Sequence, residues 1–500
     1  MSFWLPESIK SVLAGRWLAR GAAAVPAIDG STPAPGGGVS IDTRTLAPGQ
    51  VFFALRGEKV DGHAFLDAAA QAGASLAVVD TPDAIPQGAA RFNGRLSVLA
   101  VNDAPAALIR LASAWRQTLT STRVVAIAGS NGKTTTTRLT HAVLSAALKG
   151  ASSQKSFNNS IGVPLTMLNA PRSAQFLICE IGTNAPGELA PLARLVSPDT
   201  LVITSLGREH LEGFGTLEGV AREETSAILG LRPGGAVIAQ ADSPLLLEHA
   251  RAMIKAAGNG IQPGGIQLVT FGTSPEADLR ITDVRTEPPA PGRSSARTSF
   301  TINGRGRYEV PLPGAHNASN AAAAIAVARR LGLADEVIAA ALASARGAEM
   351  RLECTVVGGV AVLNDAYNAN PDSMLAALDT FAALYPQAPS RVAVLGDMLE
   401  LGEQSEQAHR EIGSAVGAML RSGALSRVVF VGPLSAHAAR EAGLAGRVEH
   451  VESLDASALS ALRATLAPGD ALLLKASRRM GLERLARALA ENVPTDQPIA

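Results

Sequence analysis

The feature that most constrains the fold is a glycine-rich segment that follows a run of apolar residues. Residues 124–128 are Val-Val-Ala-Ile-Ala, and a phosphate-loop pattern comes directly after them, made of Gly129, Ser130, Asn131, Gly132, Lys133, Thr134 and Thr135. In a strand-to-helix turn of this kind, backbone N–H groups and the helix N-terminus point at phosphate oxygens, the lysine adds a positive charge, and a hydroxyl suits Mg²⁺. The segment predicts a nucleoside-triphosphate site at one edge of a parallel sheet.

A phosphate loop alone leaves GTPases, kinases and ATPases open as functional classes. A tight turn without a ligand is the structural alternative, and Ala126 stands where the usual pattern has its first glycine. The reaction must therefore be inferred from the segments around the loop.

The chain around this loop alternates apolar runs with turns and helical patterns. Uninterrupted Val, Ile and Leu runs are typical of strands covered on both faces of a parallel sheet, and they occur at residues 124–129, 176–182, 200–207, 236–242 and 268–272. Alternation of polar and apolar residues over 279–310, around Asn303-Gly304, predicts a hairpin with an exposed loop at 287–295. The alanine-rich run 316–331 predicts a helix that ends at Gly332.

A length of 500 residues suggests three domains. We expect an α/β fold with a small N-terminal α/β domain at residues 1–102, a central P-loop ATPase-like parallel-sheet domain at 103–344, and a C-terminal Rossmann-like domain at 345–500. The first has apolar runs at 51–55, 76–80 and 96–101, and a helix over 103–119 leads out of it. The third has strand patterns at 360–365, 391–396, 427–432 and 471–476, and a helix over 372–383.

Composition excludes several classes of protein. Forty-four basic residues balance forty-four acidic ones, so net charge indicates neither a nucleic-acid nor an anionic-membrane partner. Cys179 and Cys354 stand far apart in apolar stretches, which favours two buried thiols in a reducing compartment. Residues 1–20 show helical apolar spacing broken by charges, which predicts an amphipathic surface helix and not a signal peptide. No run reaches the roughly 18 apolar residues of a membrane span, so we expect a soluble, cytoplasmic protein.

Acidic and imidazole side chains follow the next two predicted strands. Glu180 ends the run Phe-Leu-Ile-Cys-Glu, and His210 follows the run that begins at Thr200. Active sites of parallel sheets lie at the carboxyl ends of their strands, so both side chains belong beside the phosphates, where a carboxylate can hold Mg²⁺. Glu223 and Glu224, on the helix behind His210, are by composition typical of a solvated face.

Taken together, these segments resemble the Mur ligase family over essentially the whole chain. The resemblance rests on the order and spacing of Asp42-Thr-Arg-Thr, residues 48–57, the phosphate loop, residues 157–166, Glu180-Ile-Gly-Thr-Asn184, His210-Leu-Glu-Gly-Phe-Gly215, His316-Asn-Ala-Ser-Asn320, Asp365-Ala-Tyr-Asn-Ala-Asn-Pro371 and residues 395–402.

The resemblance implies an ATP-dependent amide ligase that joins D-alanyl-D-alanine to UDP-N-acetylmuramoyl-tripeptide through an acyl phosphate, with ATP and two Mg²⁺ ions, as a monomer. The first domain would bind the UDP moiety, the central one ATP and Mg²⁺, and the third would close over the nucleotide and bring the amine. Sibling ligases, a folate polyglutamylase and a non-catalytic UDP-sugar-peptide binder stay open as alternatives. The identity of the tripeptide's third residue does not follow from the sequence.

The resemblance also implies roles for individual residues. Lys133, Glu180 and His210 would be catalytic, with Thr134, Glu180 and His210 as metal ligands. ATP would contact the phosphate loop and Asn317, Asn320, Arg351 and Asp365. Substrates would contact Asp42, Thr43, Arg44, Asn158, Asn159, Thr183, Tyr367, Asn368, Asn370 and Ser373, although the Asn-Pro segment also suits a simple turn.

One position departs from the family pattern. Members often carry a carbamoylated lysine on the helix after the histidine motif, yet residues 208–233 contain no lysine. Glu224 occupies the matching position. Because carbamates and carboxylates both offer anionic oxygens, we predict Glu224 as a metal ligand that needs no CO₂-derived modification.

Overall fold

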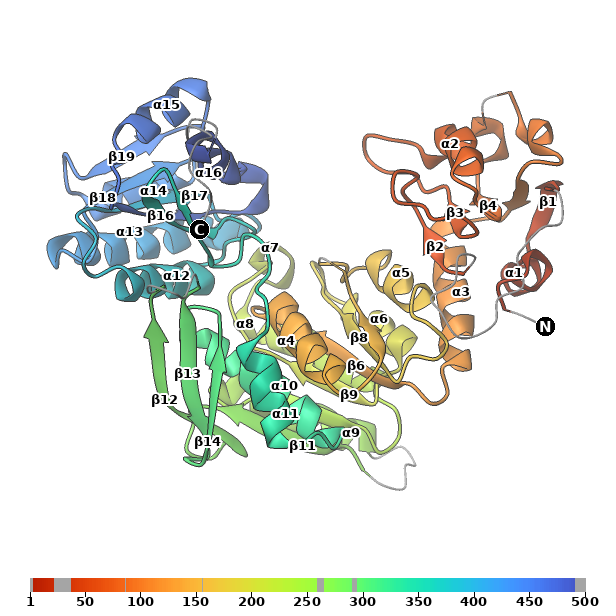
Figure 1. Cartoon of the computed structure of the whole chain (residues 1–500), viewed down its shortest axis with the longest axis horizontal. Coiled ribbons are helices and arrows are strands. Elements are labelled where there is room, and N and C mark those ends of the chain that lie inside the picture. Colours follow the sequence, from red (N-terminus) through yellow and green to blue (C-terminus); the bar gives the residue numbers. More distant parts are fainter. Residues whose placement is uncertain are drawn as a thin grey trace.

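Three sheets, each covered by helices, make up the chain (Figure 1). The computed structural model describes residues 3–21, 37–85, 87–154, 156–258, 265–289 and 295–490. The sheets use strands within residues 16–100, 123–310 and 353–475, which confirms the α/β class. The boundaries drawn at residues 102 and 344 fall between these sheets and stay proposals.

The first unit is a five-stranded sheet in the order β1-β5-β4-β3-β2, in which only β1 is antiparallel to its neighbour. Its elements are α1 (Pro6–Leu13), β1 (Arg16–Ala19), β2 (Val39–Ser40), β3 (Val51–Phe53), α2 (Leu66–Gln71), β4 (Leu76–Val79) and β5 (Ser97–Ala100). The three strands expected from the sequence are present.

The helix predicted over residues 1–20 is wrong beyond Leu13. Ala14 adopts a left-handed conformation with φ of 51°, which ends α1, and Trp17 then pairs with Leu99 of β5. Nor does α1 lie free on the surface, because Ile9 and Leu13 are buried in a core shared with the helix α3 (Ala104–Thr118). Residues 1 and 2 lie outside the described residues. The apolar face of α1 thus packs against α3 and is not exposed to solvent.

The central unit is a nine-stranded sheet in the order β14-β13-β12-β11-β10-β9-β6-β8-β7. Its strands are β6 (Arg123–Ala128), β7 (Gly150–Ser152), β8 (Phe176–Glu180), β9 (Thr200–Ile203), β10 (Ala236–Gln240), β11 (Gln267–Gly272), β12 (Leu279–Glu287), β13 (Arg297–Ile302) and β14 (Gly306–Val310). Its helices are α4 (Lys133–Ser145), α5 (Gly162–Leu168), α6 (Leu189–Val196), α7 (Leu211–Phe214), α8 (Leu217–Ser226), α9 (Pro244–Gly258), α10 (His316–Arg330) and α11 (Asp335–Ala343).

Both patterns of this unit are confirmed. The buried runs form parallel strands. β12 joins them parallel to β11, and β13 and β14 extend the sheet by antiparallel pairing, with Asn303 and Gly304 at positive φ in the hairpin turn. The predicted helix 316–331 is α10, with Gly332 at positive φ just beyond it. Of the loop predicted at 287–295, residues 290–294 lie outside the described residues.

The third unit is a six-stranded sheet in the order β15-β16-β20-β17-β18-β19, parallel except for β15. Its elements are β15 (Glu353–Val357), β16 (Val360–Asp365), α12 (Pro371–Leu384), β17 (Arg391–Gly396), α13 (Ser405–Arg421), β18 (Arg427–Val431), α14 (Ser435–Ala442), β19 (Val448–Val451), α15 (Ala456–Ala464), β20 (Ala471–Lys475) and α16 (Glu483–Ala490). Cys354 of β15 is half-buried and Cys179 fully buried, and both are free thiols.

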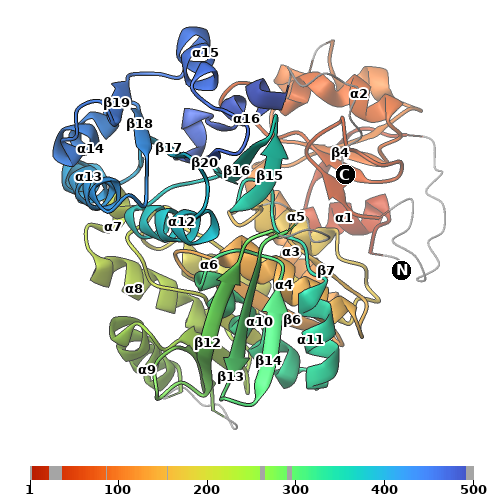
Figure 2. The ribbon, with the colours of Figure 1, turned by 60° about the vertical axis from the view of Figure 1, so that its left-hand side comes forward.

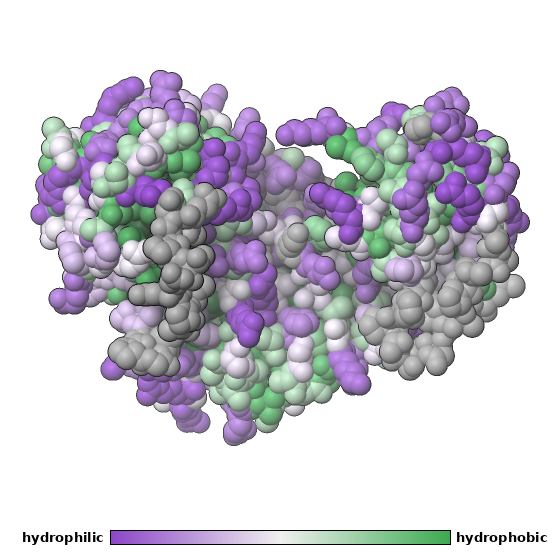
Figure 3. All heavy atoms as spheres, turned by 45° about the horizontal axis from the view of Figure 1, so that its top comes forward, coloured by the Kyte–Doolittle hydropathy of each residue, from purple (hydrophilic) through white to green (hydrophobic). Residues whose placement is uncertain are grey.

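The third unit rests on the central one (Figures 1 and 2), and the first unit contacts the central one through β2, where Asn169 accepts the Val39 N–H at 3.1 Å. Helix α12 packs on β12, and α7 packs on the short turn at residues 402–404. The molecular surface is hollowed between the first and third units (Figure 3). None of the helices in the described part of the chain is long and apolar enough to span a membrane.

Candidate functional site

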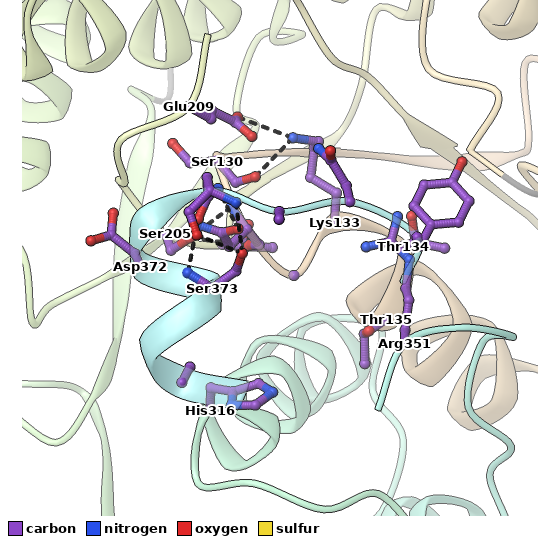
Figure 4. A pocket seen from close by; sticks show the side chains of 18 of the residues that line it. Ser130, Lys133, Thr134, Thr135, Ser205, Glu209, His316, Arg351, Asp372 and Ser373 are labelled. Atoms are coloured by element: carbon purple, nitrogen blue, oxygen red, sulfur yellow. Dashed lines mark hydrogen bonds and ion pairs between the residues drawn. The ribbon is translucent and has the colours of Figure 1, made fainter. Parts of the chain in front are cut away.

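A cavity of about 560 Å³ lies where the central sheet's carboxyl edge meets the third unit. It brings together most of the residues singled out from the sequence, from three parts of the chain: Ser130, Asn131, Gly132, Lys133, Thr134, Thr135, Asn158, Glu180, His210, Asn317, Asn320, Arg351, Asp365, Tyr367, Asn368, Asn370 and Ser373. Figure 4 shows how several of these side chains converge.

The phosphate loop joins β6 to α4, as its sequence predicts. Gly129 has a φ of 112°, and a Cβ there would lie 2.3 Å from the Thr204 hydroxyl oxygen. Gly132 has a φ of 88°, and its Cβ would lie 2.2 Å from Asn320 Oδ1. Both positions therefore require glycine for conformation and for space. The free N–H groups at the start of α4 are left to face the cavity.

Lys133 is folded back onto the loop. Its Nζ donates to the carbonyl oxygens of Gly129 at 2.6 Å and Ser130 at 3.1 Å, and lies 3.3 Å from Glu209 Oε1 (Figure 4). Burial opposes the charge of Lys133, but Glu209, Glu224 and Glu180 outweigh it and raise the pKa of the ammonium. Lys133 is thus a charged group held within reach of an incoming phosphate.

Glu180 carries an acceptor without a donor. It ends β8 with 1% of its surface exposed; its Oε1 accepts from Asn158 at 3.0 Å, whereas its buried Oε2 accepts no hydrogen bond. Burial raises the pKa of Glu180, although Lys133 and Arg351 act against this. A buried carboxylate oxygen without a partner is costly unless a cation completes it. The hydroxyl oxygens of Thr134 and Ser156 lie 3.3 Å from each other. Together with the Glu180 carboxylate they offer the oxygen ligands that suit Mg²⁺.

Within the described residues, no three His, Cys, Asp or Glu side chains are clustered closely enough to hold a metal by themselves. Mg²⁺ is commonly held by one or two carboxylates together with phosphate oxygens and water. The donor set around Glu180 therefore fits an ion that arrives with a nucleotide.

His210 faces the third unit. Its Nδ1 lies 2.7 Å from Glu400 Oε2, and Glu400 also accepts the Glu212 N–H through its backbone carbonyl, at 3.2 Å. Burial lowers the pKa of His210, but the hydrogen bond to Glu400 and the charge of Glu209 outweigh it and leave that pKa raised. The hydrogen bond to His210 lowers the pKa of Glu400. His210 thus links the central sheet to the third unit.

Glu209 is a functional candidate that the sequence reasoning missed. It is 7% exposed, lines the cavity and faces Lys133. Burial raises its pKa, against the pull of Lys133 and His210. Its place directly before His210, after a strand's carboxyl end, was the available signal.

Glu223 and Glu224 do not form a solvated face, so that reading of α8 is wrong. Glu224 is 2% exposed, and its Oε2 accepts the Gly129 N–H at 2.7 Å; Glu223 accepts the N–H groups of Gly187 and Leu189. Burial raises the pKa of Glu224 to about 7. Each carboxylate binds backbone donors of a neighbouring turn, and Glu224 is not among the residues that line the cavity.

The third unit contributes a rigid loop between β16 and α12. Lys475, only 2% exposed and also missed in the sequence, donates to Asp365 Oδ2 at 2.5 Å and to the Asn368 carbonyl at 3.1 Å. Arg351 lies over the Tyr367 ring at 4.2 Å. Lys475 thus ties the start of the loop at Asp365 to its middle at Asn368.

The Asn-Pro segment is more than a turn. Asn370 and Ser373 form a capping box at the start of α12, and Asn370 Nδ2 donates to Asn131 Oδ1 of the phosphate loop at 2.9 Å. The start of α12 is thereby tied directly to the phosphate loop.

Arg208 ties the same two units together more strongly. Its Nε and Nη2 donate to Asp372 Oδ1 at 3.0 and 2.7 Å, and its Nη1 and Nη2 donate to Glu411 at 2.6 and 3.0 Å. The three consecutive residues 208–210 therefore point to α12 and α13, to the phosphate loop and to Glu400. Residues 208–210 therefore contact both the third unit and the side chains that line the cavity.

Several predicted substrate residues lie outside the cavity lining. Asn159 Oδ1 accepts the N–H groups of Ile161 and Gly162 at the start of α5, and Thr183 donates to the Ala185 carbonyl at 2.7 Å. Asp42 and Arg44 pair with each other in the first unit, next to Thr43. The structure does not bring Asp42 and its neighbours to the cavity.

Comparison with known proteins gives a consistent relationship. Three family models match successive parts of the chain: Mur ligase family, catalytic domain, at residues 37–116; Mur ligase middle domain at 127–328; and Mur ligase, glutamate ligase domain, at 350–478. The UDP-N-acetylmuramoyl-tripeptide--D-alanyl-D-alanine ligase of Bacillus subtilis is 36% identical over 464 residues, which are 91% of this chain and 93% of that protein.

The Escherichia coli ligase of the same name is 34% identical over 463 residues, covering 91% of this chain and 94% of its own. A crystal structure of MurF from Acinetobacter baumannii superposes with a TM-score of 0.78 at 27% identity, covering 98% of this chain and 99% of that one. Sequence, fold and site agree, and the chain belongs to the Mur ligase family.

Proposed function

We propose that this chain joins D-alanyl-D-alanine to UDP-N-acetylmuramoyl-tripeptide and converts ATP to ADP and phosphate, giving UDP-N-acetylmuramoyl-pentapeptide. The observation that carries the proposal is one cavity lined by the phosphate loop, the carboxylate of Glu180 and the loop from Tyr367 to Ser373. The similar proteins of Bacillus subtilis and Escherichia coli are named for this reaction.

The chemistry explains why such a cavity needs both halves. A carboxylate is a poor acyl donor, so an oxygen of the tripeptide's terminal carboxylate first takes the γ-phosphoryl group while ADP leaves. The dipeptide's amine nitrogen then attacks the acyl carbon and releases a proton. Phosphate departs with the former carboxylate oxygen, and the amide bond remains. Exclusion of water protects the acyl phosphate between these steps.

Lys133 and the N–H groups at the start of α4 are proposed to hold the β- and γ-phosphates. Thr134, Glu180 and His210 would hold Mg²⁺, with two ions expected. Mg²⁺ neutralises the charge that gathers when two anions approach each other. The buried, unpartnered Oε2 of Glu180 supports this assignment.

The remaining assignments follow the family pattern and stay proposals. Asn317 and Asn320 would lie near the base and Arg351 and Asp365 near the phosphate and ribose. The muramoyl peptide would contact Asn158, Asn159 and Thr183, the dipeptide Tyr367, Asn368, Asn370 and Ser373, and the UDP moiety Asp42, Thr43 and Arg44. All these groups belong to one chain, which supports a monomer, and ATP and a UDP-linked precursor support the cytoplasm as the place of reaction.

The test is phosphate release from ATP in the presence of UDP-muramoyl tripeptide, with D-alanyl-D-alanine, single amino acids or no acceptor. We expect turnover that depends on D-alanyl-D-alanine. Selective turnover with a single amino acid would assign a sibling activity instead. Tight binding of the UDP substrate without turnover by any acceptor would indicate a non-catalytic binder.

A further inference from the structure

We propose that Glu209 is a ligand for the nucleotide's cation, and that its carboxylate is paired with Lys133 until the triphosphate binds. The inference rests on the proposed ATP-dependent function and deepens it. It replaces Glu224, the residue that the sequence suggested, by one that faces the cavity.

The first step is the position of the three buried carboxylates near Lys133. Glu180 and Glu209 line the cavity, whereas Glu224 does not. Glu224 is engaged by the Gly129 N–H at 2.7 Å. The carboxylate of Glu209 has a 3.3 Å contact with the Lys133 side chain, and no backbone donor is bound to it in the described structure. Glu209, unlike Glu224, can therefore take a new partner without giving up a backbone hydrogen bond.

The second step is independent evidence that a cation belongs here. Glu180 lines the cavity and is 1% exposed, and its Oε2 lacks a hydrogen-bond donor. A buried carboxylate oxygen without a hydrogen-bond donor indicates that a cation binds beside it. Glu180 and Glu209 line the same cavity as Lys133, and the negative charges of both raise the pKa of its ammonium.

The third step is an exchange that keeps charge balanced. Before nucleotide binds, Lys133 partners Glu209 and two loop carbonyls. When phosphates arrive, the ammonium has a stronger set of anionic acceptors and turns toward them. Glu209 would then be a buried, uncompensated carboxylate beside a polyanion, which is unfavourable unless a cation replaces the lysine. The cation thus becomes necessary only in the nucleotide complex.

This exchange predicts opposite effects of one substitution under two conditions. In Glu209→Gln without divalent metal, repulsion of the phosphates is removed and Lys133 is released, so a non-hydrolysable ATP analogue binds tighter than to the wild type. With Mg²⁺, the variant lacks an anionic ligand. The tightening produced by Mg²⁺ therefore falls by about tenfold or more relative to the wild type.

The experiment is calorimetric titration of the full chain with AMP-PNP, in EDTA and in excess Mg²⁺. The measured quantity is the ratio of the two dissociation constants. Glu209→Asp keeps the charge and should recover part of the Mg²⁺ effect. Glu224→Gln is the matched control: it alters a buried carboxylate of α8 that accepts from the phosphate loop but does not line the cavity, and it should leave the ratio at the wild-type value. Binding of Mn²⁺ to the AMP-PNP complex, followed by electron paramagnetic resonance, should weaken in Glu209→Gln alone.

Equal weakening of Glu209→Gln in EDTA and in Mg²⁺, or an unchanged ratio, would overturn the role of Glu209, since a structural residue changes both constants alike. If Glu209→Gln does not fold, Glu209→Asp with the wild-type ratio and Glu224→Gln with a reduced one would also overturn it. Failure of the wild type to bind AMP-PNP at all would refute the proposed function itself, so the two failures are distinguishable.

Discussion

Replacing Arg208 by methionine is expected to loosen the third unit from the central one without disturbing either core. The guanidinium is half-buried and donates four hydrogen bonds to two carboxylates, of Asp372 on α12 and Glu411 on α13. Methionine keeps the length of the aliphatic stem and removes only the charge and the donors. The backbone N–H of Arg208 still donates to Asp372 Oδ2, at 2.8 Å in the wild type.

The magnitude follows from exposure and geometry. The Arg208 side chain is 32% exposed, and its partners are 39% and 37% exposed, so solvent screens both pairs. Exposed ion pairs contribute up to about 1 kcal/mol each, with well-aligned ones at the upper end. Two such pairs give about 2 kcal/mol, or about 30-fold in the equilibrium between docked and undocked units. Because residues of both units line the cavity proposed for the nucleotide, AMP-PNP affinity should fall by up to that factor.

The assay combines titration with AMP-PNP and small-angle scattering of the nucleotide-free chain. Arg208→Met should weaken binding and enlarge the radius of gyration, and high salt should reduce its difference from the wild type. Arg329→Met is the control. The Arg329 side chain donates to Asp335 at 2.8 Å and is about as exposed as that of Arg208, but this pair lies entirely within the central unit. Equal affinity and scattering for the wild type and Arg208→Met would refute the docking role.

Three further predictions concern the buried carboxylates and the loop. Glu180→Gln should lower phosphate release by at least about a hundredfold, yet raise the Tm, because burial raises the pKa of Glu180 and its charged form destabilises the fold; calorimetry and a phosphate assay check both. For Glu224, whose folded pKa of about 7 exceeds its ordinary 4.5, the wild type loses stability as pH rises between those values, and a Tm series should show no such loss in Glu224→Gln relative to the wild type. Gly129→Ala should destabilise by about 2 kcal/mol or more in urea unfolding and abolish AMP-PNP binding, since its Cβ would overlap Thr204; wild-type values in these three measurements would contradict the respective assignments.

The parallel sheets were predictable because their strands are buried on both faces. Runs such as residues 176–180 and 391–396 have no polar face, and this pattern is specific to covered parallel strands. The strands that were missed lie at or near edges. β19 (Val448–Val451) is partly exposed and contains a glutamate and a histidine, so its sequence gives no strong apolar signal.

Within the site, residues on strand ends and in the phosphate loop were predictable, since chain topology alone brings carboxyl ends to one edge. The partners of those residues were not. Glu400 reaches His210, and Asp372 reaches Arg208, across a joint between units far apart in sequence. Glu224 illustrates the same limit, because its position on α8 was identified but the direction of its carboxylate depends on how α8 packs beside Gly129.

The most direct measurement of the central claim is the fate of an isotopic label. UDP-muramoyl tripeptide carrying ¹⁸O in its terminal carboxylate would be incubated with ATP and D-alanyl-D-alanine, and mass spectrometry would be applied to both products. Ligation through an acyl phosphate predicts a UDP-muramoyl pentapeptide and transfer of one carboxylate oxygen into the released phosphate. Phosphate without label, or phosphate formed with no pentapeptide, would contradict ligation through an acyl phosphate.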